Sequence, residues 1–304
     1  MAEEVVNEVV EEVAATAVPE TQEPEVEVEE ESVAETAVTS PLATTILENG
    51  VVRVGINADP LYPFIYLDED APRGFEIDLA QALVAQMFGE DMAIEWVSVT
   101  TENRLQALAD GEIDLLIRNT THTVSREADA LWTRPYFLDG QRVLVTNGGG
   151  IEDIAQLDGE IICVPLNSEW ANNLEGYTAT QGFSWELIEL GEGGPFMEGA
   201  CSAVSLDWSL LMHQGLAFNM MGVTDAPWRT IGPLLVNKAD GTQLGYEPIA
   251  IGTPLSDPLF RDLADEALGE LVADGIWQDL YDEWMPEEAP WSSEEMLNAP
   301  PAER

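Results

Sequence analysis

The chain has 304 residues, 45% of them hydrophobic, and carries 58 Asp and Glu against 11 Lys and Arg, a formal net charge of -47. That charge repels nucleic acid and anionic membrane surfaces, which excludes both as direct electrostatic partners. No run of 18 apolar residues occurs, so we expect no direct membrane insertion of this chain. With two Cys and two His, neither a zinc site nor an iron–sulfur cluster is expected, and we expect no cofactor.

The N-terminal segment is the most acidic part of the chain. Residues 1–50 contain 14 Glu and no Asp, Lys or Arg, and three prolines interrupt them. Charge of one sign with frequent prolines is typical of solvated, self-repelling tails. We therefore predict that residues 1–48 form a disordered acidic tether. The remainder is also acidic and has a single lysine, which fits either a protein of a salt-rich environment or an acidic secreted protein.

Strands and helices alternate with short connections from residue 51 onward. In the first strand Val52, Val54 and Ile56 alternate on one face. The elements predicted up to residue 147 are strands at 51–58, 93–99, 112–119 and 141–147 and helices at 74–89 and 101–111. This order is typical of a mostly parallel sheet with helices on both faces.

A second α/β unit follows. Its predicted elements are helices at 151–159, 168–182 and 207–215 and strands at 160–167, 185–190, 200–207 and 245–252, before helices over 257–285. Two such units predict two lobes, each with a mostly parallel sheet, and a ligand cleft between them.

Three segments of the chain resemble a known family. They read RGFEIDLAQALVAQMFG (73–89), NRLQALADGEIDLLIRNTTHTVSRE (103–127) and LADEALGELVADGIWQDLYDEWM (263–285). In this order they are similar to the extracytoplasmic solute-binding proteins of family 3, which deliver polar amino acids to ABC transporters. The RNTTHTVSR loop and the placement of the cysteines look most like the general L-amino-acid-binding branch. The resemblance covers roughly residues 50 to 286.

The resemblance implies a bilobal, type II periplasmic-binding-protein-like α/β fold. On this basis lobe 1 takes residues 51–138 and 247–286, and lobe 2 takes residues 139–246. Residues 287–304 are expected to form a loose C-terminal tail. Crossovers between the lobes are expected near residues 136–140 and 243–248.

Arg126 is the first candidate ligand-binding residue. A guanidinium binds a carboxylate through two parallel hydrogen bonds, and Arg126 stands in a Thr-rich loop just after a strand. The resemblance implies that Thr121 and the backbone of Asn119 belong to the same site. The alternative is a surface arginine paired with one of the many acids.

Asp207 is the second candidate, because it ends an apolar strand and, by resemblance, takes the ligand's ammonium group. An ammonium has three donors and needs acceptors when it leaves water. Asp207 is equally suited to cap the following helix. Asn167 and Ser168 open another helix, whose free amides favour an anion, although capping alone explains them as well.

Two further expectations concern aromatic side chains and cysteines. By resemblance, Tyr62 and Phe64 cover the aliphatic part of the ligand, although core packing is the alternative for at least one of them. Cys163 and Cys201 are expected to form a disulfide, as an isolated pair does in a secreted protein. Two buried thiols are the alternative that fits a cytosolic protein.

The resemblance implies that the protein binds an L-amino acid and delivers it to the permease subunits of an ABC transporter. Because the family delivers polar amino acids, a polar ligand is expected. We expect no enzymatic activity. The alternative is a cyclohexadienyl (prephenate or arogenate) dehydratase on the same scaffold, with Glu169 as its general acid. The resemblance further implies a periplasmic or extracellular location and a lipid anchor supplied by a removed N-terminal signal.

Overall fold

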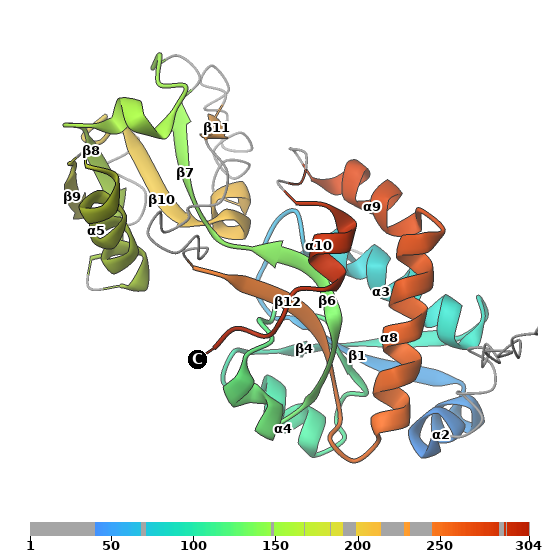
Figure 1. Ribbon diagram of the computed structural model, residues 1–304. Coiled ribbons are helices and arrows are strands. Elements are labelled where there is room, and N and C mark those ends of the chain that lie inside the picture. Colours follow the sequence, from blue (N-terminus) through green and yellow to red (C-terminus); the bar gives the residue numbers. More distant parts are fainter. Residues whose placement is uncertain are drawn as a thin grey trace, which may run out of the picture. The chain divides into compact units, whose positions relative to one another are not determined.

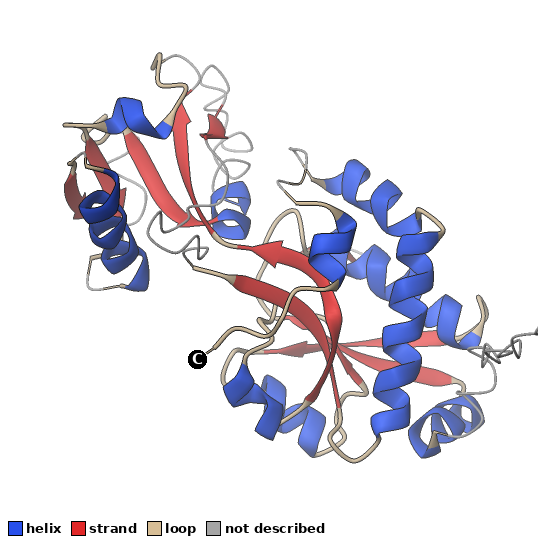
Figure 2. Cartoon of the chain, viewed as in Figure 1, coloured by secondary structure: helices blue, strands red, loops and turns tan. Residues whose placement is uncertain are grey.

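The computed structural model describes residues 40–67, 71–146, 149–166, 168–182, 184–190, 199–213, 228–231, 245–285, 289 and 291–303. The strands in these residues form two five-stranded sheets and one two-stranded ribbon (Figures 1 and 2). The two-stranded ribbon consists of β2 (Tyr66–Leu67) and β3 (Pro72–Arg73). Two short 3-10 helices are η1 (Val124–Ala128) and η2 (Ile154–Leu157).

The first sheet has the strand order β4-β1-β5-β12-β6. Its strands are β1 (Val51–Asn57), β4 (Ala93–Val99), β5 (Leu115–Leu116), β6 (Leu131–Asp139) and β12 (Glu247–Thr253). The β1 strand pairs in parallel with β4 and β5, whereas β12 is antiparallel to β5 and β6.

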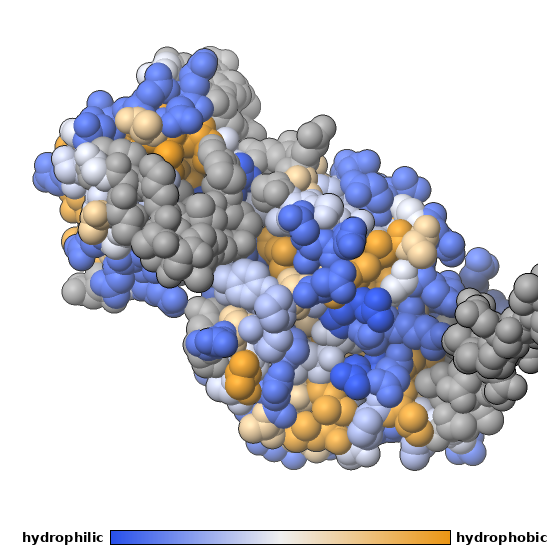
Figure 3. All heavy atoms as spheres, in the orientation of Figure 1, coloured by the Kyte–Doolittle hydropathy of each residue, from blue (hydrophilic) through white to orange (hydrophobic). Residues whose placement is uncertain are grey.

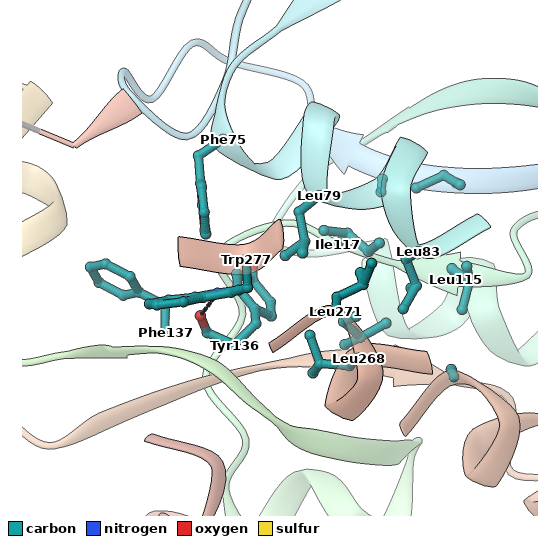
Figure 4. Packing of buried hydrophobic residues seen from close by; sticks show 14 of the residues in the cluster. Phe75, Leu79, Leu83, Leu115, Ile117, Tyr136, Phe137, Leu268, Leu271 and Trp277 are labelled. Carbon is teal, nitrogen blue, oxygen red and sulfur yellow. Dashed lines mark hydrogen bonds between the residues drawn. The ribbon is translucent and has the colours of Figure 1, made fainter. Parts of the chain in front are cut away.

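Apolar side chains cover both faces of the first sheet. Leu115 and Ile117 belong to one buried cluster and Leu116, between them, to another, as expected for a strand with alternating side chains. The helices around this sheet are α3 (Phe75–Phe88), α4 (Arg104–Ala109), α8 (Pro258–Ala273) and α9 (Ile276–Trp284). Figure 4 shows Leu79 and Leu83 of α3 packed near Leu268 and Leu271 of α8 in the larger cluster.

The second sheet has the strand order β11-β7-β10-β8-β9. Its strands are β7 (Gln141–Thr146), β8 (Ile161–Val164), β9 (Glu186–Glu189), β10 (Ala203–Asp207) and β11 (Trp228–Ile231), and helix α5 (Glu169–Gln181) packs against it. Val143 and Val145 point into one cluster and Leu144 into the other, so this sheet is also buried on both faces.

The α/β class predicted from the sequence is confirmed, but the sheets are mixed and not mostly parallel. The β8 strand is parallel to β9 and β10, whereas β7 is antiparallel to β10 and β11. The reason is that β6 ends at Asp139 and β7 begins at Gln141, so one extended stretch leaves the first sheet and enters the second across Gly140. The predicted bounds of the two lobes, 51–138 with 247–286 and 139–246, remain a prediction. The division of the strands between the two sheets supports it.

The predicted tether extends too far at its C-terminal end. Residues 1–39 lie outside the described residues, but α2 (Pro41–Asn49) is a helix, so disorder up to residue 48 is wrong. The side chain of Ser40 caps this helix, and Asp257 Oδ2 accepts hydrogen bonds from Ser40 Oγ at 2.8 Å and Leu42 N at 2.9 Å. Burial of Ala43 and Ile46 then anchors the helix to the first sheet's core.

The C-terminal segment is not loose where it is described. Residues 293–297 form helix α10 (Ser293–Leu297), which begins with a capping box between Ser292 and Glu295. Met296 is fully buried, and Trp291 Nε1 donates to Leu138 O at 2.8 Å. These apolar contacts explain why the predicted tail folds back on the first sheet.

The predicted disulfide is confirmed. Cys163 of β8 is bonded to Cys201, with Cα atoms 5.8 Å apart. Both residues lie in the apolar cluster on one face of the second sheet. The bond therefore ties β8 to the segment that leads into β10.

The described residues on the face shown in Figure 3 are predominantly hydrophilic. Blue, hydrophilic residues cover much of the face in Figure 3, and the orange areas between them are separate from one another. Among the helices of the described residues, none combines the length and apolarity needed to cross a membrane.

Candidate functional site

A pocket of about 270 Å³ lies beside the end of β10 and the start of α5. Acidic side chains and a tryptophan dominate its wall. Its lining residues are Glu169, Trp170, Asn173, Asp207, Gly245 and Glu247. No group of three or more Asp, Glu, His or Cys in the described part of the chain is arranged to hold a metal ion, so these carboxylates do not indicate a metal centre.

Asp207 is held in place at this pocket by its neighbours. It is the last residue of β10 and lies opposite Gln141 in the antiparallel pair with β7. Trp170 Nε1 donates a hydrogen bond of 2.9 Å to Asp207 Oδ1. A side chain on Gly245 would approach the same oxygen to 3.4 Å, so the chain passes close to the carboxylate on that side.

Gln141 connects helix α5 to the second sheet beneath the pocket. Its side chain is fully buried, and its Nε2 donates to Trp170 O at 2.9 Å and to Ser205 Oγ at 3.0 Å. Its Oε1 accepts from Asn173 Nδ2 at 3.0 Å. Since every polar atom of this amide has a partner, Gln141 fixes Trp170 and Asn173 relative to β10.

The loop that follows β5 is anchored to α3 through Asn119. Asn119 has a φ of 42°, in the left-handed region that Asn tolerates better than most residues. Its backbone N–H donates to Glu76 Oε1 and lies 3.2 Å from the hydroxyl of Tyr136. Tyr136 in turn donates to the same Glu76 oxygen at 2.5 Å.

Glu76 is the most perturbed acid of this anchor. It is 1% exposed at the start of α3. Burial raises the pKa of Glu76 to about 7, against the hydrogen bonds from Tyr136 and Asn119, which lower it. The loop therefore rests on a carboxyl group that titrates near neutral pH.

Arg126 is linked to the pocket through Thr121. Its Nη1 donates to Thr121 O at 2.6 Å, and its backbone N–H donates to Thr123 Oγ1 at 3.3 Å. The hydroxyl of Thr121 donates to Glu247 Oε2, and Glu247 lines the pocket together with Asp207. The guanidinium-bearing loop and the Asp207 pocket are thus connected by two hydrogen bonds.

Asp139 and Glu247 lie opposite each other on the two strands that cross between the sheets. Asp139 is buried and accepts from the backbone N–H of Gly140 at 2.8 Å and from both the backbone N–H and the hydroxyl of Ser209. Burial raises the pKa of Asp139 to about 6, although these hydrogen bonds lower it. A polar cluster therefore joins β6, β12 and the residues after β10 at the crossover.

The other residues singled out in the sequence fall into three groups. Ser168 caps α5, since its Oγ accepts from Ala171 N at 3.2 Å, and Asn167 lies outside the described residues. Tyr62 is half-buried, and its backbone N–H donates to His213 Nδ1 at 3.0 Å. Phe64 is fully buried and packs edge-on against Phe137, so core packing, not ligand cover, is its role.

Sequence reasoning missed several residues that build the site. Glu247 begins a strand without any motif around it, and Gln141 directly follows a glycine at the crossover. Glu76 stands inside the quoted family-like segment, but nothing in its spacing indicates burial beside Asn119.

The model of the bacterial extracellular solute-binding proteins, family 3, matches residues 52–287. The glutamate/glutamine/aspartate/asparagine-binding protein BztA of Rhodobacter capsulatus is 28% identical over 172 residues, 55% of this chain and 49% of BztA. The general L-amino acid-binding periplasmic protein AapJ of Rhizobium johnstonii is 28% identical over 202 residues, 64% of this chain and 59% of AapJ. The chain therefore spans about half the length of the first relatives it matches.

Solved structures share the fold. An ancestral arginine-binding protein bound to arginine is 26% identical, with a TM-score of 0.50, and the match covers 78% of this chain and 98% of that protein. The ancestral amino acid-binding protein AncCDT-1, a precursor of cyclohexadienyl dehydratase, is 20% identical, with a TM-score of 0.54, and the match covers 79% of this chain and 98% of that protein. The second match shows the fold alone.

Proposed function

The chain belongs to the bacterial extracellular solute-binding proteins of family 3, and we propose that it binds an L-amino acid and delivers it to the permease subunits of an ABC transporter. The observation that carries the proposal is the link from Arg126 through Thr121 to Glu247 at the wall of the Asp207 pocket. It connects a guanidinium and a carboxylate, the two groups that complement the two ends of a zwitterion.

The protein has a group suited to bind each charged end of the ligand. The ammonium group carries three donors, and the pocket wall supplies carboxylate oxygens from Asp207 and Glu247. The α-carboxylate suits the planar fork of Arg126, whose orientation Thr121 O fixes. The proposed binding is reversible and non-covalent, and its affinity comes from charge-assisted hydrogen bonds in a partly desolvated pocket.

Transport requires that the ligand can enter and leave. The strands that cross between the sheets, at Gly140 and at the start of β12, are the natural hinges of such a protein. The cluster of Asp139, Ser209 and Glu247 lies at these strands, so a hinge rotation would act directly on a residue of the pocket.

The proposed location is outside the cytoplasmic membrane. The family is extracellular, and a disulfide persists in oxidising compartments. We further propose a periplasmic or cell-surface position with a lipid anchor added to an upstream signal. Metabolic labelling of the native protein with a radioactive fatty acid tests the anchor, and absence of label contradicts it.

A thermal-shift screen with the twenty amino acids tests the binding function. A ligand present at a hundredfold excess over its dissociation constant stabilises the folded protein by about 2.7 kcal/mol. We expect at least one L-amino acid to raise the melting temperature and its D-enantiomer to leave it unchanged. A screen in which no amino acid raises the melting temperature contradicts the proposal.

Glu169 supports a second candidate function, that of a cyclohexadienyl dehydratase, because it lines the same pocket as Asp207. Its side chain is exposed at the start of α5. Incubation with prephenate or arogenate separates the two functions. Turnover that Glu169→Gln abolishes would establish the enzyme, whereas we expect no turnover by either form.

A further inference from the structure

The chain that follows α9 folds back over the loop that carries Arg126. The family model matches residues 52–287, so residues 291–303 follow the matched part of the chain. They begin with α10, which Figure 1 shows beside β6, and the two elements are in contact. We call residues 291–303 the strap and residues 119–126 the ligand loop.

The strap pairs with the ligand loop through its backbone. Ala302 forms an isolated parallel bridge with Thr123. The N–H of Ala302 donates to His122 O at 2.9 Å, and the N–H of Val124 donates to Ala302 O at 3.0 Å. Ala302 is 5% exposed, so water has little access to the strap side of these bonds. Both backbone groups of one buried residue are therefore bonded to the ligand loop.

The ligand loop is also bonded to β12, but at a different place. Thr121 forms an antiparallel bridge with Ile249, and the N–H of His122 donates to Pro248 O at 2.7 Å. The backbone of His122 thus bonds to β12 through its N–H and to the strap through its carbonyl. The first half of the loop is held by β12, and the strap holds the residues that follow.

The part of the loop that the strap holds connects the groups that orient Arg126. Arg126 Nη1 donates to Thr121 O at 2.6 Å, and its backbone N–H donates to Thr123 Oγ1 at 3.3 Å. Val124, between them and Arg126 in the chain, is 51% exposed, so apolar packing does not fix it. The orientation of the guanidinium therefore depends on a stretch of backbone that is bonded to the strap.

The strap has anchors of its own near the crossover between the sheets. Trp291 Nε1 donates to Leu138 O at 2.8 Å, near the end of β6. Met296 is fully buried in the core of the first sheet. The hydroxyl of Tyr246, which directly precedes β12, donates to Pro300 O at 2.8 Å. These contacts fix the strap without the ligand loop, so the strap can support the loop.

We propose, on the basis of the proposed function, that the strap is a positioning element of the binding site, which holds the ligand loop in the conformation that presents Arg126 to the α-carboxylate. A loop that is ordered before the ligand arrives loses less conformational entropy on binding, and this raises the affinity. Ala302 is the positioning residue, because its N–H and its carbonyl both bond to the loop.

Titration calorimetry on the full chain tests the inference, with the L-amino acid that gives the largest thermal shift among the twenty. Ala302→Pro removes the N–H that donates to His122 O. We expect it to weaken binding about threefold to tenfold, the effect of one net hydrogen bond. The matched control is Glu303→Pro, which adds the same ring at an exposed residue whose N–H has no backbone partner among the described residues. It should leave the affinity unchanged.

Amide hydrogen exchange of the empty protein separates positioning from a general loss of stability. In Ala302→Pro we expect the N–H of Val124 to exchange about threefold to tenfold faster, because the strap loses one of its two bonds to the loop. The N–H of Leu79, in the buried core of the first sheet, should exchange as in the wild type. Tyr246→Phe, which keeps the ring but removes the bond to Pro300 O, should also speed exchange at Val124.

Three results would overturn the inference while leaving the proposed function intact. One is unchanged affinity in Ala302→Pro, and another is an equal loss of affinity in Glu303→Pro. The third is an equal acceleration of exchange at Leu79 and Val124, which would assign the strap to overall stability. If no amino acid binds the wild type, the proposed function fails, whereas exchange at Val124 still shows whether the strap holds the loop.

Discussion

The hydroxyl of Thr121 donates a hydrogen bond to Glu247, a residue 126 positions away in the sequence. This contact joins the loop that carries Arg126 to the first residue of β12, which borders the Asp207 pocket. The loop of Arg126 and the pocket of Asp207, which are proposed to bind the two ends of the ligand, are therefore connected through Glu247 at the crossover between the sheets. Changes at this crossover should affect both the stability of the protein and its affinity for the ligand.

Gly245 is the first such position. Its φ of +61° is strained for any residue with a side chain, and a Cβ would lie 3.2 Å from Gln141 and 3.4 Å from Asp207 Oδ1. We expect Gly245→Ala to lower the free energy of unfolding by about 1 to 2 kcal/mol from backbone strain, and to weaken ligand binding by displacing Asp207. Thermal unfolding and calorimetry measure the two effects.

Gly50→Ala is the matched control, because Gly50 has a φ of +69° and no atom within 4 Å of the added Cβ. It should lose similar stability without any loss of affinity. If Gly245→Ala binds the ligand as tightly as Gly50→Ala does, the close approach at Asp207 does not matter for binding.

Glu76 should make stability depend on pH. Its pKa of about 7 exceeds the ordinary value of 4.5, so the folded protein takes up a proton relative to the unfolded chain between these pH values. The free energy of unfolding should therefore fall as the pH rises from about 4.5 to 7 and then level off, by about 3 kcal/mol in total for this group. Denaturant unfolding at a series of pH values measures the curve.

Glu76→Gln should remove this decline and raise stability at pH 8. Glu76 Oε2 and Asn119 Oδ1 are both buried acceptors without a partner among the described residues, and an amide at position 76 supplies a donor there. Glu90→Gln, an exposed change beyond α3, controls for net charge. A Glu76→Gln variant that keeps the slope of the wild type between pH 5 and 7 would show that another group causes it.

The disulfide should contribute to stability and not to binding. Closing a loop between residues 38 positions apart lowers the unfolded-state entropy by an amount equivalent to about 4 kcal/mol. Reductant should therefore lower the melting temperature of the wild type but not that of a variant with both cysteines changed to Ala. Ligand affinity should stay within about threefold, because Cys163 and Cys201 lie in the core and do not line the pocket.

Much of the local structure could be predicted because each element has its own signal. The helix at 75–88 follows from its apolar spacing, and Ser168 is a recognisable cap for α5. The cysteine pair was predictable from the class of protein. Arg126 and Asp207 could be predicted because each is a charged residue near the end of an apolar strand, Arg126 in the Thr-rich loop that follows one and Asp207 as the last residue of another.

The long-range relationships could not be predicted, since no local pattern encodes them. Thr121 and Glu247 meet only because β12 returns to the first sheet beside β6. No local pattern predicts the burial of Phe64 either, because it packs against Phe137, far away in the sequence. The α2 helix could not be predicted from composition, because residues 1–50 are acidic throughout, although Ser40 followed by a proline is a helix start.

The most direct test of the proposed function is titration calorimetry of the best-binding amino acid against the wild type, Arg126→Ala and Asp207→Ala. Each variant should lose about 2 to 5 kcal/mol of binding free energy, because each strands one charged end of the ligand in a desolvated pocket. The melting temperature of the empty protein should change little, which separates binding from folding. Unchanged affinity in Arg126→Ala would contradict the proposal that Arg126 binds the α-carboxylate of the ligand.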